Sequence, residues 1–377
     1  MTTMLHLTSV RAHVYRTPIE TPVTTSFGTM RDRPMVLVEV EDRDGVKGFG
    51  EVWCNYPHVG AEHRARLVES VLAPLATATP HARPEALFQH LTAATEVLAI
   101  QCGEAGPFAQ AIAGVDIAAW DLVARKQGKP LWQLIGGSSP TIRVYASGLN
   151  PSSPEVLART RHDQGYRAFK LKIGFGAERD IANLHALRHE LGATIDLMVD
   201  ANQAWTLAQA LDTAPRLERF GITWLEEPLR ADRPWDEWER LKSVTKLPLA
   251  AGENISGLPR FDEALSRRAL SFVQPDIAKW GGVSGCKSVA KRIAESGAVY
   301  CPHYLGGGIG LLASAHLLAG VGGSGRLEID ANDNPLRTTL CGPLDDIRDG
   351  QATLTDKPGL GIGEDDVAAI GRYRVLH

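Results

Sequence analysis

The sequence predicts an α/β protein in which a β/α barrel follows a smaller α+β domain that caps it. Two observations predict this fold. From about residue 143 onward, short apolar runs alternate with helical stretches, a pattern typical of parallel strands joined by helical crossovers. An ionisable residue also closes each of seven successive units, at intervals between 23 (276−253) and 28 (200−172) residues. A barrel spends about that length on one β/α unit.

Length and composition restrict the class of protein. At 377 residues the chain exceeds the usual size of one core, so we expect one large and one smaller domain. The net charge of −4 and the lack of a Lys/Arg block argue against nucleic acid or a membrane as partner, and favour a small molecule. The five cysteines are scattered, which argues against a disulfide framework and a zinc site. We expect a cytoplasmic protein and a homo-oligomer.

The first third of the chain mixes strands and helices. Residues 34–40 and 46–53 flank Asp44-Gly45, which is a signal for an antiparallel hairpin. Helical spacing of apolar residues then predicts helices over 64–75, 84–100 and 110–127.

The barrel strands are predicted over 169–173, 195–199, 222–225, 247–251, 272–273 and 298–301. The ionisable residues at or just past successive strand ends are Lys172, Asp200, Glu226, Glu253, Asp276, His303 and Glu328. The carboxyl ends of barrel strands carry the chemistry of such enzymes. Charged residues also end strands merely because loops are hydrated. Seven residues in register favour a functional site.

Three carboxylates on neighbouring strands indicate a metal site. Asp200, Glu226 and Glu253 cannot all stay ionised at close range without a cation. All-oxygen ligation suits Mg²⁺, with Mn²⁺ as an alternative ion. Glu227 is adjacent to Glu226, but alternation along a strand predicts that its side chain points the other way.

Lys170 and Lys172 are two residues apart and should face the same side of a strand. Because neighbouring cations lower each other's pKa, Lys172 is predicted to be partly neutral near pH 7 and to act as a base. The alternative is a solvated strand end, although two buried lysines without a purpose would be costly.

His303 and Asp276 end adjacent predicted strands, so the imidazole and the carboxylate are expected to form a hydrogen bond. Such a carboxylate orients the ring and raises its basicity. A single histidine is more often structural, but this one precedes the glycine-rich turn 306–308 at the barrel mouth. We interpret the pair as an acid/base dyad. A side-chain base can remove a proton next to a carboxylate only if the resulting enediolate is strongly stabilised, and a metal does this.

Taken together, the motifs resemble the mandelate racemase subgroup of the enolase superfamily, that is, the mandelate racemase/muconate lactonizing enzyme family. The motifs are Gly114-Val115-Asp116-Ile117-Ala118-Ala119-Trp120-Asp121, Lys170-Leu171-Lys172-Ile173-Gly174, Val199-Asp200-Ala201-Asn202-Gln203, Trp224-Leu225-Glu226-Glu227-Pro228, Gly252-Glu253-Asn254, Pro275-Asp276 with Lys279 and Gly281-Gly282, and His303. Each is weak alone, but together, in order and correctly spaced, they cover nearly the whole chain.

The resemblance implies a (β/α)7β modified TIM barrel in residues 136–340, with an α+β capping domain in 1–135 to which the segment 341–377 returns. It assigns the metal ligands to Asp200, Glu226 and Glu253. It makes Lys172 one base with Lys170 as its electrostatic neighbour, and His303 with Asp276 the second acid/base. The group binding the substrate carboxylate would be Glu328.

Substrate choice in this family is set by capping loops, expected here at 22–33 and 53–60. The residues predicted to bind substrate are Asn202, Lys279, Ser147, Thr25, Ser26 and Trp53. The first loop is more polar than an aryl pocket needs, although a hydrated loop would look the same.

The resemblance leaves three functions open. We favour dehydration of an acid sugar to a 2-keto-3-deoxy acid, through Mg²⁺-dependent removal of the proton α to a carboxylate and a metal-stabilised enediolate. More known members with this site dehydrate sugars. The alternatives are a racemase or epimerase of a 2-hydroxy acid and a catalytically silent barrel. Asp276 stands where lysine-lysine relatives carry a lysine, which disfavours that mechanism.

Overall fold

The computed structural model describes residues 4–26 and 28–375. Within them, eight parallel strands form a near-closed barrel with the order β10-β9-β8-β7-β6-β5-β4-β11. The strands are β4 (Thr141–Leu149), β5 (Ala168–Lys172), β6 (Asp196–Asp200), β7 (Ile222–Glu226), β8 (Leu249–Ala251), β9 (Phe272–Val273), β10 (Val299–Tyr300) and β11 (Arg326–Asp330).

A helix follows each of the first seven barrel strands in this described part of the chain. The helices are α6 (Pro154–Asp163), α7 (Ala177–Leu191), α8 (Leu207–Leu217), α9 (Trp235–Val244), α10 (Leu258–Ser266), α11 (Gly282–Ser296) and α12 (Gly308–Val321). The short 3-10 helix η2 (Glu218–Phe220) extends α8. The predicted (β/α)7β barrel is therefore confirmed.

The barrel interior changes from apolar to polar toward the carboxyl ends of its strands. A buried cluster of Tyr145, Ala168, Met198, Trp224, Ala250 and Cys301 fills the lower part. Because side chains two residues apart share one face of a strand, the next inward positions lie nearer the mouth. Those positions are Ser147, Lys170, Asp200, Glu226 and, past the end of β10, His303. One strand periodicity thus sets both the core and the site.

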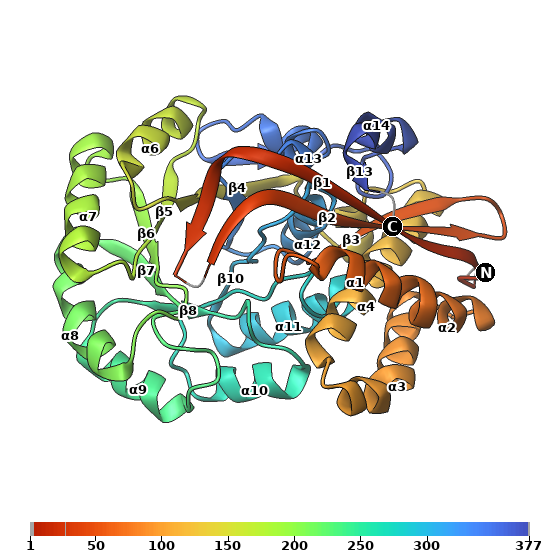
Figure 1. The fold of residues 1–377 in the computed structure, drawn as a ribbon, viewed down its shortest axis with the longest axis horizontal. Coiled ribbons are helices and arrows are strands. Elements are labelled where there is room, and N and C mark those ends of the chain that lie inside the picture. The colour runs from red at the N-terminus through yellow and green to blue at the C-terminus, as the bar shows by residue number, and fades with distance from the viewer. Residues whose placement is uncertain (1–3, 27, 376–377) are drawn as a thin grey trace.

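The capping part begins with an antiparallel sheet of order β13-β1-β2-β3. Its strands are β1 (Leu7–Thr25), β2 (Gly28–Asp42), β3 (Lys47–Val52) and β13 (Arg374–Val375). Figure 1 shows the ribbon of β1 and β2 arching from the capping helices across the barrel strands. The expected loop at 22–33 is wrong in form, because Val23 pairs with Met30 and Thr24 with Thr29 in a ladder beyond a bulge.

Helices cover the capping sheet on one side. They are α1 (Gly60–Leu67), the π-helix η1 (Val68–Leu72), α2 (Ala73–Ala78), α3 (Pro84–Cys102) and α4 (Ala105–Lys126). The short helix α5 (Leu131–Ile135) packs instead against α12 of the barrel. Helix α4 packs against β3. This close approach requires glycine in β3, since a Cβ on Gly50 would lie 2.1 Å from the carbonyl oxygen of Gly114. The helices predicted over 64–75 and 110–127 are present with earlier starts, at Gly60 and Ala105, and the helix predicted over 84–100 begins at Pro84 as expected.

The C-terminal segment contacts both parts. It contains α13 (Pro335–Thr338), η3 (Gly342–Asp345), β12 (Gln351–Thr353), α14 (Glu364–Ala369) and η4 (Gly371–Tyr373). Strand β12 pairs with β4 of the barrel, whereas β13 pairs with β1. The division of the chain at residues 135 and 340 stays a prediction. No helix in 4–26 or 28–375 is long and apolar enough to cross a bilayer.

A buried ion pair links the arched strands to the barrel. The Arg33 guanidinium in β2 lies 2.7 Å from Asp330 Oδ2 at the end of β11, and both side chains are 3% exposed. Arg337 approaches the same carboxylate at 3.5 Å. Arg33 is therefore buried and links the capping strand β2 to the barrel strand β11.

Candidate active site

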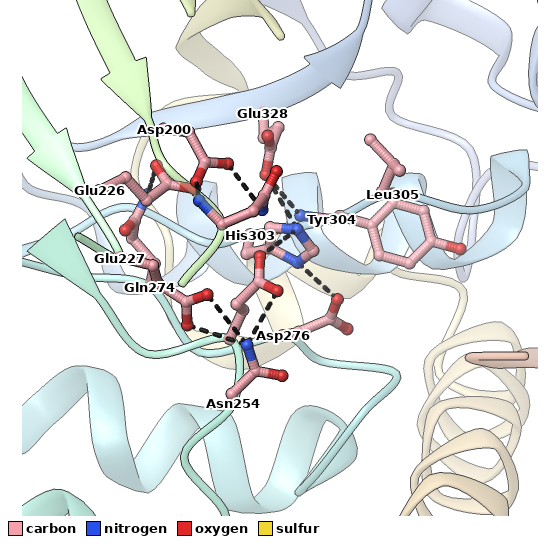
Figure 2. A network of polar contacts seen from close by, with 12 residues as sticks. Asp200, Glu226, Glu227, Asn254, Gln274, Asp276, His303, Tyr304, Leu305 and Glu328 are labelled. Carbon is pink, nitrogen blue, oxygen red and sulfur yellow. Dashed lines mark hydrogen bonds and ion pairs between the residues drawn. The ribbon is translucent and has the colours of Figure 1, made fainter. Parts of the chain in front are cut away.

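The strand ends bring the predicted ionisable residues into one buried cluster, part of which Figure 2 shows. Lys172, Asp200 and Glu226 are the last residues of β5, β6 and β7, and they are register partners in series. Asp276 and His303 form a parallel bridge just past β9 and β10. The barrel pairing itself thus sets the order of charges around the mouth.

The two lysines of β5 are each paired with carboxylates. Lys170 Nζ lies 2.8 Å from Glu328 Oε1 and also donates to Glu226, while Lys172 Nζ lies 2.6 Å from Asp200 Oδ2. Burial lowers the pKa of Lys172, but Asp200 and further carboxylates outweigh burial and Lys170, so the pKa is raised. The predicted lowering is therefore wrong for this arrangement, because it weighed only the neighbouring cation.

Glu226 and Glu227 both turn into the site. Glu226 accepts hydrogen bonds from Trp224 Nε1 at 2.9 Å and Gln274 Nε2 at 2.6 Å. Glu227 accepts a hydrogen bond from Asn254 Nδ2 at 2.9 Å, and Figure 2 shows this link between Glu227 and Asn254. The expectation that Glu227 points away is wrong, because β7 ends at Glu226 and Glu227 adopts a φ of 37°. Strand alternation no longer applies at that residue.

His303 lies between three carboxylates. Its Nδ1 is 2.7 Å from Asp276 Oδ2, and its Nε2 is 2.7 Å from Glu253 Oε2 and 3.7 Å from Glu328 Oε2. Figure 2 shows the ring between Asp276 and the remaining carboxylates. Burial lowers the pKa of His303, but these carboxylates raise it well above its usual value. The predicted contact with Asp276 is present, and the charged imidazolium is favoured.

Lys279 is held by a predicted metal ligand and by the cap. Its Nζ lies 3.0 Å from Glu253 Oε1, 3.2 Å from Asn254 Oδ1 and 4.9 Å from the centre of the Trp53 ring. The ring and the carboxylate together fix the ammonium group. The substrate-binding roles of Lys279 and Trp53 stay predictions.

The other predicted substrate-binding residues also have partners within the chain. Ser26 Oγ donates to the Asn202 carbonyl at 2.8 Å, so the tip of the arched strands touches the loop after β6. Asn202 Nδ2 in turn donates to Asp200 Oδ2 at 3.1 Å. Ser147 Oγ donates to Glu328, and Thr25 Oγ1 donates to the Gly28 carbonyl at 3.0 Å. Ser147 and Asn202 thus lie directly beside the charged cluster.

Sequence reasoning missed four polar residues around the site. Gln274 and Asn254 orient Glu226 and Glu227, as described above. Glu51 and Asn55 reach the segment after His303 from the capping sheet and its following loop. A signal was available for Glu51, which is a carboxylate within the apolar run Gly48-Phe49-Gly50-Glu51-Val52 and is only 2% exposed.

The charges of the cluster do not balance. Six carboxylates, Asp200, Glu226, Glu227, Glu253, Asp276 and Glu328, face three lysines, Lys170, Lys172 and Lys279, and His303. With the histidine protonated the sum is 4 − 6 = −2. Burial, Glu253 and Asp200 raise the pKa of Glu227 well above its usual value, as this excess requires. A divalent cation with oxygen ligands fits the donor set and the missing charge.

The three carboxylates predicted to bind a metal do not converge on a common position in this structure. Among the described residues, no three His, Cys, Asp or Glu side chains form a cluster ready to hold a metal ion. The physical reason is that Asp200, Glu226 and Glu253 each pair with a different cation, namely Lys172, Lys170 and either Lys279 or His303. Metal binding would therefore compete with these ion pairs.

Comparisons with known proteins agree with this architecture. Residues 8–136 match the family model of the mandelate racemase/muconate lactonizing enzyme N-terminal domain, and residues 155–368 match the enolase C-terminal domain-like model. The arabinonate dehydratase of Saccharolobus solfataricus is 31% identical over 342 residues, covering 88% of this chain and 89% of the relative. Other relatives are cycloisomerases and racemases.

Solved structures are similar over almost the whole chain. A mandelate racemase/muconate lactonizing enzyme from Bordetella bronchiseptica is 54% identical with a TM-score of 0.93, covering 98% of this chain and 100% of that one. A racemase from Streptomyces coelicolor, crystallised with bound magnesium, is 28% identical with a TM-score of 0.85, covering 99% and 100%.

Proposed function

The chain belongs to the mandelate racemase/muconate lactonizing enzyme family of the enolase superfamily, and on this premise we propose that it dehydrates an acid sugar to a 2-keto-3-deoxy acid. One observation carries the proposal. A buried lysine and a buried histidine approach one carboxylate cluster from different units of the barrel, Lys172 beside Asp200 at the end of β5 and His303 beside Glu253 past the end of β10. Such an arrangement provides a proton acceptor and a proton donor at two positions around one substrate.

In the proposed reaction the C–H bond next to the substrate carboxylate breaks first. Lys172 takes the proton, which leaves an enediolate, and the electron pair of this enediolate then forms the C2–C3 double bond as the C3–O bond breaks. His303, whose raised pKa favours the charged form, protonates the departing hydroxyl, which leaves as water. The resulting enol becomes a 2-keto acid. Lys172 must first give its proton away, because Asp200 raises its pKa.

We propose Asp200, Glu226 and Glu253 as the ligands of one Mg²⁺. When bound, the ion would stabilise negative charge developing on the substrate carboxylate. As a metal ligand, Asp200 would pair less closely with Lys172, which would weaken the ion pair that holds this lysine protonated. Glu328, with Ser147 and Lys170 beside it, is proposed to bind the substrate carboxylate. For Glu328 this requires a shared proton or a bridging lysine.

The reaction is tested by incubating the enzyme and Mg²⁺ with a panel of mono- and diacid sugars in D₂O. Dehydration yields a 2-keto acid, detected by NMR. A racemase or epimerase instead returns a 2-hydroxy acid with deuterium at the α-carbon. If neither product appears with any acid while Mg²⁺ binds, the proposed dehydratase is wrong.

The ligand set is tested by calorimetric titration with Mg²⁺, which needs no substrate. Glu226→Gln should weaken binding more than Glu227→Gln, and Glu239→Gln, a partly exposed residue of α9, is the control. A stronger effect of Glu227→Gln would transfer the ligand role to Glu227, which already lies toward Glu253 through their shared contact with Asn254.

A further inference from the structure

The segment that carries His303 is not part of a regular strand. Strand β10 ends at Tyr300, and α12 begins at Gly308, so His303 lies within the seven residues between them (301–307). Its position depends on the contacts that this segment makes with the rest of the molecule. Some come from the barrel, since the Tyr304 amide donates to Glu328 Oε2 at 3.1 Å and Asn334 Nδ2 to the Gly306 carbonyl at 2.9 Å.

The capping sheet supplies a second set of contacts through Glu51. This carboxylate of β3 accepts hydrogen bonds from the Gly307 amide at 2.5 Å and from the Gly310 amide at 2.9 Å, one on each oxygen. These amides lie at the start of α12, where backbone donors have no partner within the helix. A negative charge is also favoured at a helix N-terminus. Glu51, which belongs to the capping sheet, thus accepts hydrogen bonds from two backbone amides that have no partner within the barrel helix.

Asn55 adds a third contact from the cap. Its Nδ2 donates to the Leu305 carbonyl at 2.6 Å, two residues after His303. The backbone from residue 305 to the first turn of α12 is therefore bonded to the cap at residues 305, 307 and 310. All three contacts join a side chain of the cap to a backbone amide or carbonyl, and none is part of the barrel sheet, whose strand order ends at β10.

The glycines of this segment allow the close approach. A Cβ on Gly307 would lie 2.8 Å from Glu51 Oε1 and 2.4 Å from Met35 Sδ. A Cβ on Gly306 would lie 2.9 Å from Glu51 Oε1. Larger residues would push the carboxylate and the loop apart. The glycine-rich segment 306–308 and the buried Glu51 thus contact each other, and the small size of Gly306 and Gly307 makes this contact possible.

We propose that Glu51 is a positioning residue, through which the capping sheet fixes the His303 segment for proton transfer while leaving Lys172 unaffected. The inference rests on the proposed function for its catalytic readout. Glu51 acts through backbone amides and does not touch the reacting atoms. A displacement of a catalytic group by about 1 Å can cost on the order of 100-fold in rate.

The test compares two reactions of one variant. In Glu51→Gln, the amide NH₂ replaces one acceptor, so Gly307 or Gly310 loses its partner. We expect formation of the 2-keto acid, which uses His303, to fall about 10-fold to 100-fold. Exchange of the α-proton with D₂O through Lys172 should fall less than about 3-fold. The control Glu39→Gln, in the neighbouring strand and paired with Lys47 at 3.8 Å, should change neither reaction.

A merely structural role of Glu51 predicts that both reactions fall together with the thermal midpoint, and that result would overturn the proposal. Unchanged product formation would overturn it too. If Glu51→Gln does not fold, Gly307→Ala disturbs the same contact from the barrel side, with Gly106→Ala as control because no atom lies within 4 Å of its Cβ. The same split between the two reactions is expected.

Two measurements without substrate separate this proposal from the proposed function. Hydrogen exchange of the Gly307 and Gly310 amides should be about 10-fold faster in Glu51→Gln, and the ¹⁵N resonances of the His303 ring should shift. If the wild type turns over no acid sugar but both signals change, the reaction is wrong and the positioning stands. If neither signal changes, the positioning is wrong whatever the reaction.

Discussion

The two sides of the barrel mouth hold their acid/base groups in different ways. Lys172 ends the five-residue strand β5, which pairs with both β4 and β6, and Lys172 itself pairs with Asp200. His303 lies three residues beyond the two-residue strand β10 and keeps one bridge, to Asp276. The lysine is placed by paired barrel strands. The histidine is placed by the barrel and the cap together.

This difference suggests that the two sides respond differently to damage. A perturbation of the cap should reach His303 and leave Lys172 in register, because a strand paired on both sides resists displacement. A perturbation of the central strands should affect both. The following variants test this division, from the largest expected effect to the smallest.

Lys172→Met should reduce both α-proton exchange and 2-keto acid formation by roughly 10³- to 10⁴-fold, because it removes a general base and leaves Asp200 without its 2.6 Å partner. The measurement is NMR of the reaction in D₂O. The exposed Lys246→Met serves as control. Retention of exchange would move the role of base on this side to another residue.

His303→Asn should reduce 2-keto acid formation by roughly 100- to 1000-fold, because the proton donor for the departing hydroxyl is lost. Exchange of the α-proton through Lys172 should persist. Full dehydratase activity in this variant would show that His303 is not the proton donor. The comparison between the Lys172 and His303 sides of the barrel mouth would then have no catalytic meaning.

Arg33→Met should destabilise the protein by about 3 kcal/mol, because it leaves the buried Asp330 without its main partner. Chemical denaturation measures the loss. The exposed pair of Arg230 and Asp232 provides the control, since Arg230→Met should cost less than about 1 kcal/mol. Equal effects of the two substitutions would mean that the ion pair contributes little to attachment of the cap.

Asp276→Asn should reduce 2-keto acid formation by roughly 10- to 100-fold, because a partner that orients the imidazole is altered. The effect on pH dependence has a defined sign. Asp276 helps to raise the pKa of His303, and the acid works only when protonated, below that pKa. In the variant this pKa falls, so the alkaline loss of activity should begin at lower pH. A profile unchanged in the pH–rate measurement would argue against Asp276 as the orienting group.

The barrel could be predicted because it repeats. Each unit shows the same succession of apolar strand, ionisable residue and helix, and two-residue alternation places Lys170, Asp200 and Glu226 above an apolar layer. These are local rules that act within one strand. They hold wherever the strand is regular, which is why the order of charges around the mouth follows from the sequence.

The features that the sequence did not predict lie where regular strand geometry ends or depend on contacts between distant residues. Glu227 turns inward because its φ of 37° breaks the alternation one residue past β7. The pKa of Lys172 depends on Asp200, whose distance no sequence spacing gives. The pairing of β1 with β2 near Thr24 resumes after a bulge between Pro18 and Val23. The polar residues there look like a loop in the sequence, although they form a strand that pairs with β2. Glu51 meets Gly307 across 256 residues, and no local pattern reports such a contact.

The pairing of β13 with β1 has a consequence for synthesis of the chain. The outer edge of β1 is completed at Val14 and Tyr15 by Val375 and Arg374, which are made 359 residues (374−15) after Tyr15. At about 5 to 20 residues per second, that edge waits roughly 18 to 72 s for its partner. Open strand edges are sites of pairing with other chains. A ribosome-bound nascent chain therefore exposes at β1 an edge that the finished protein covers.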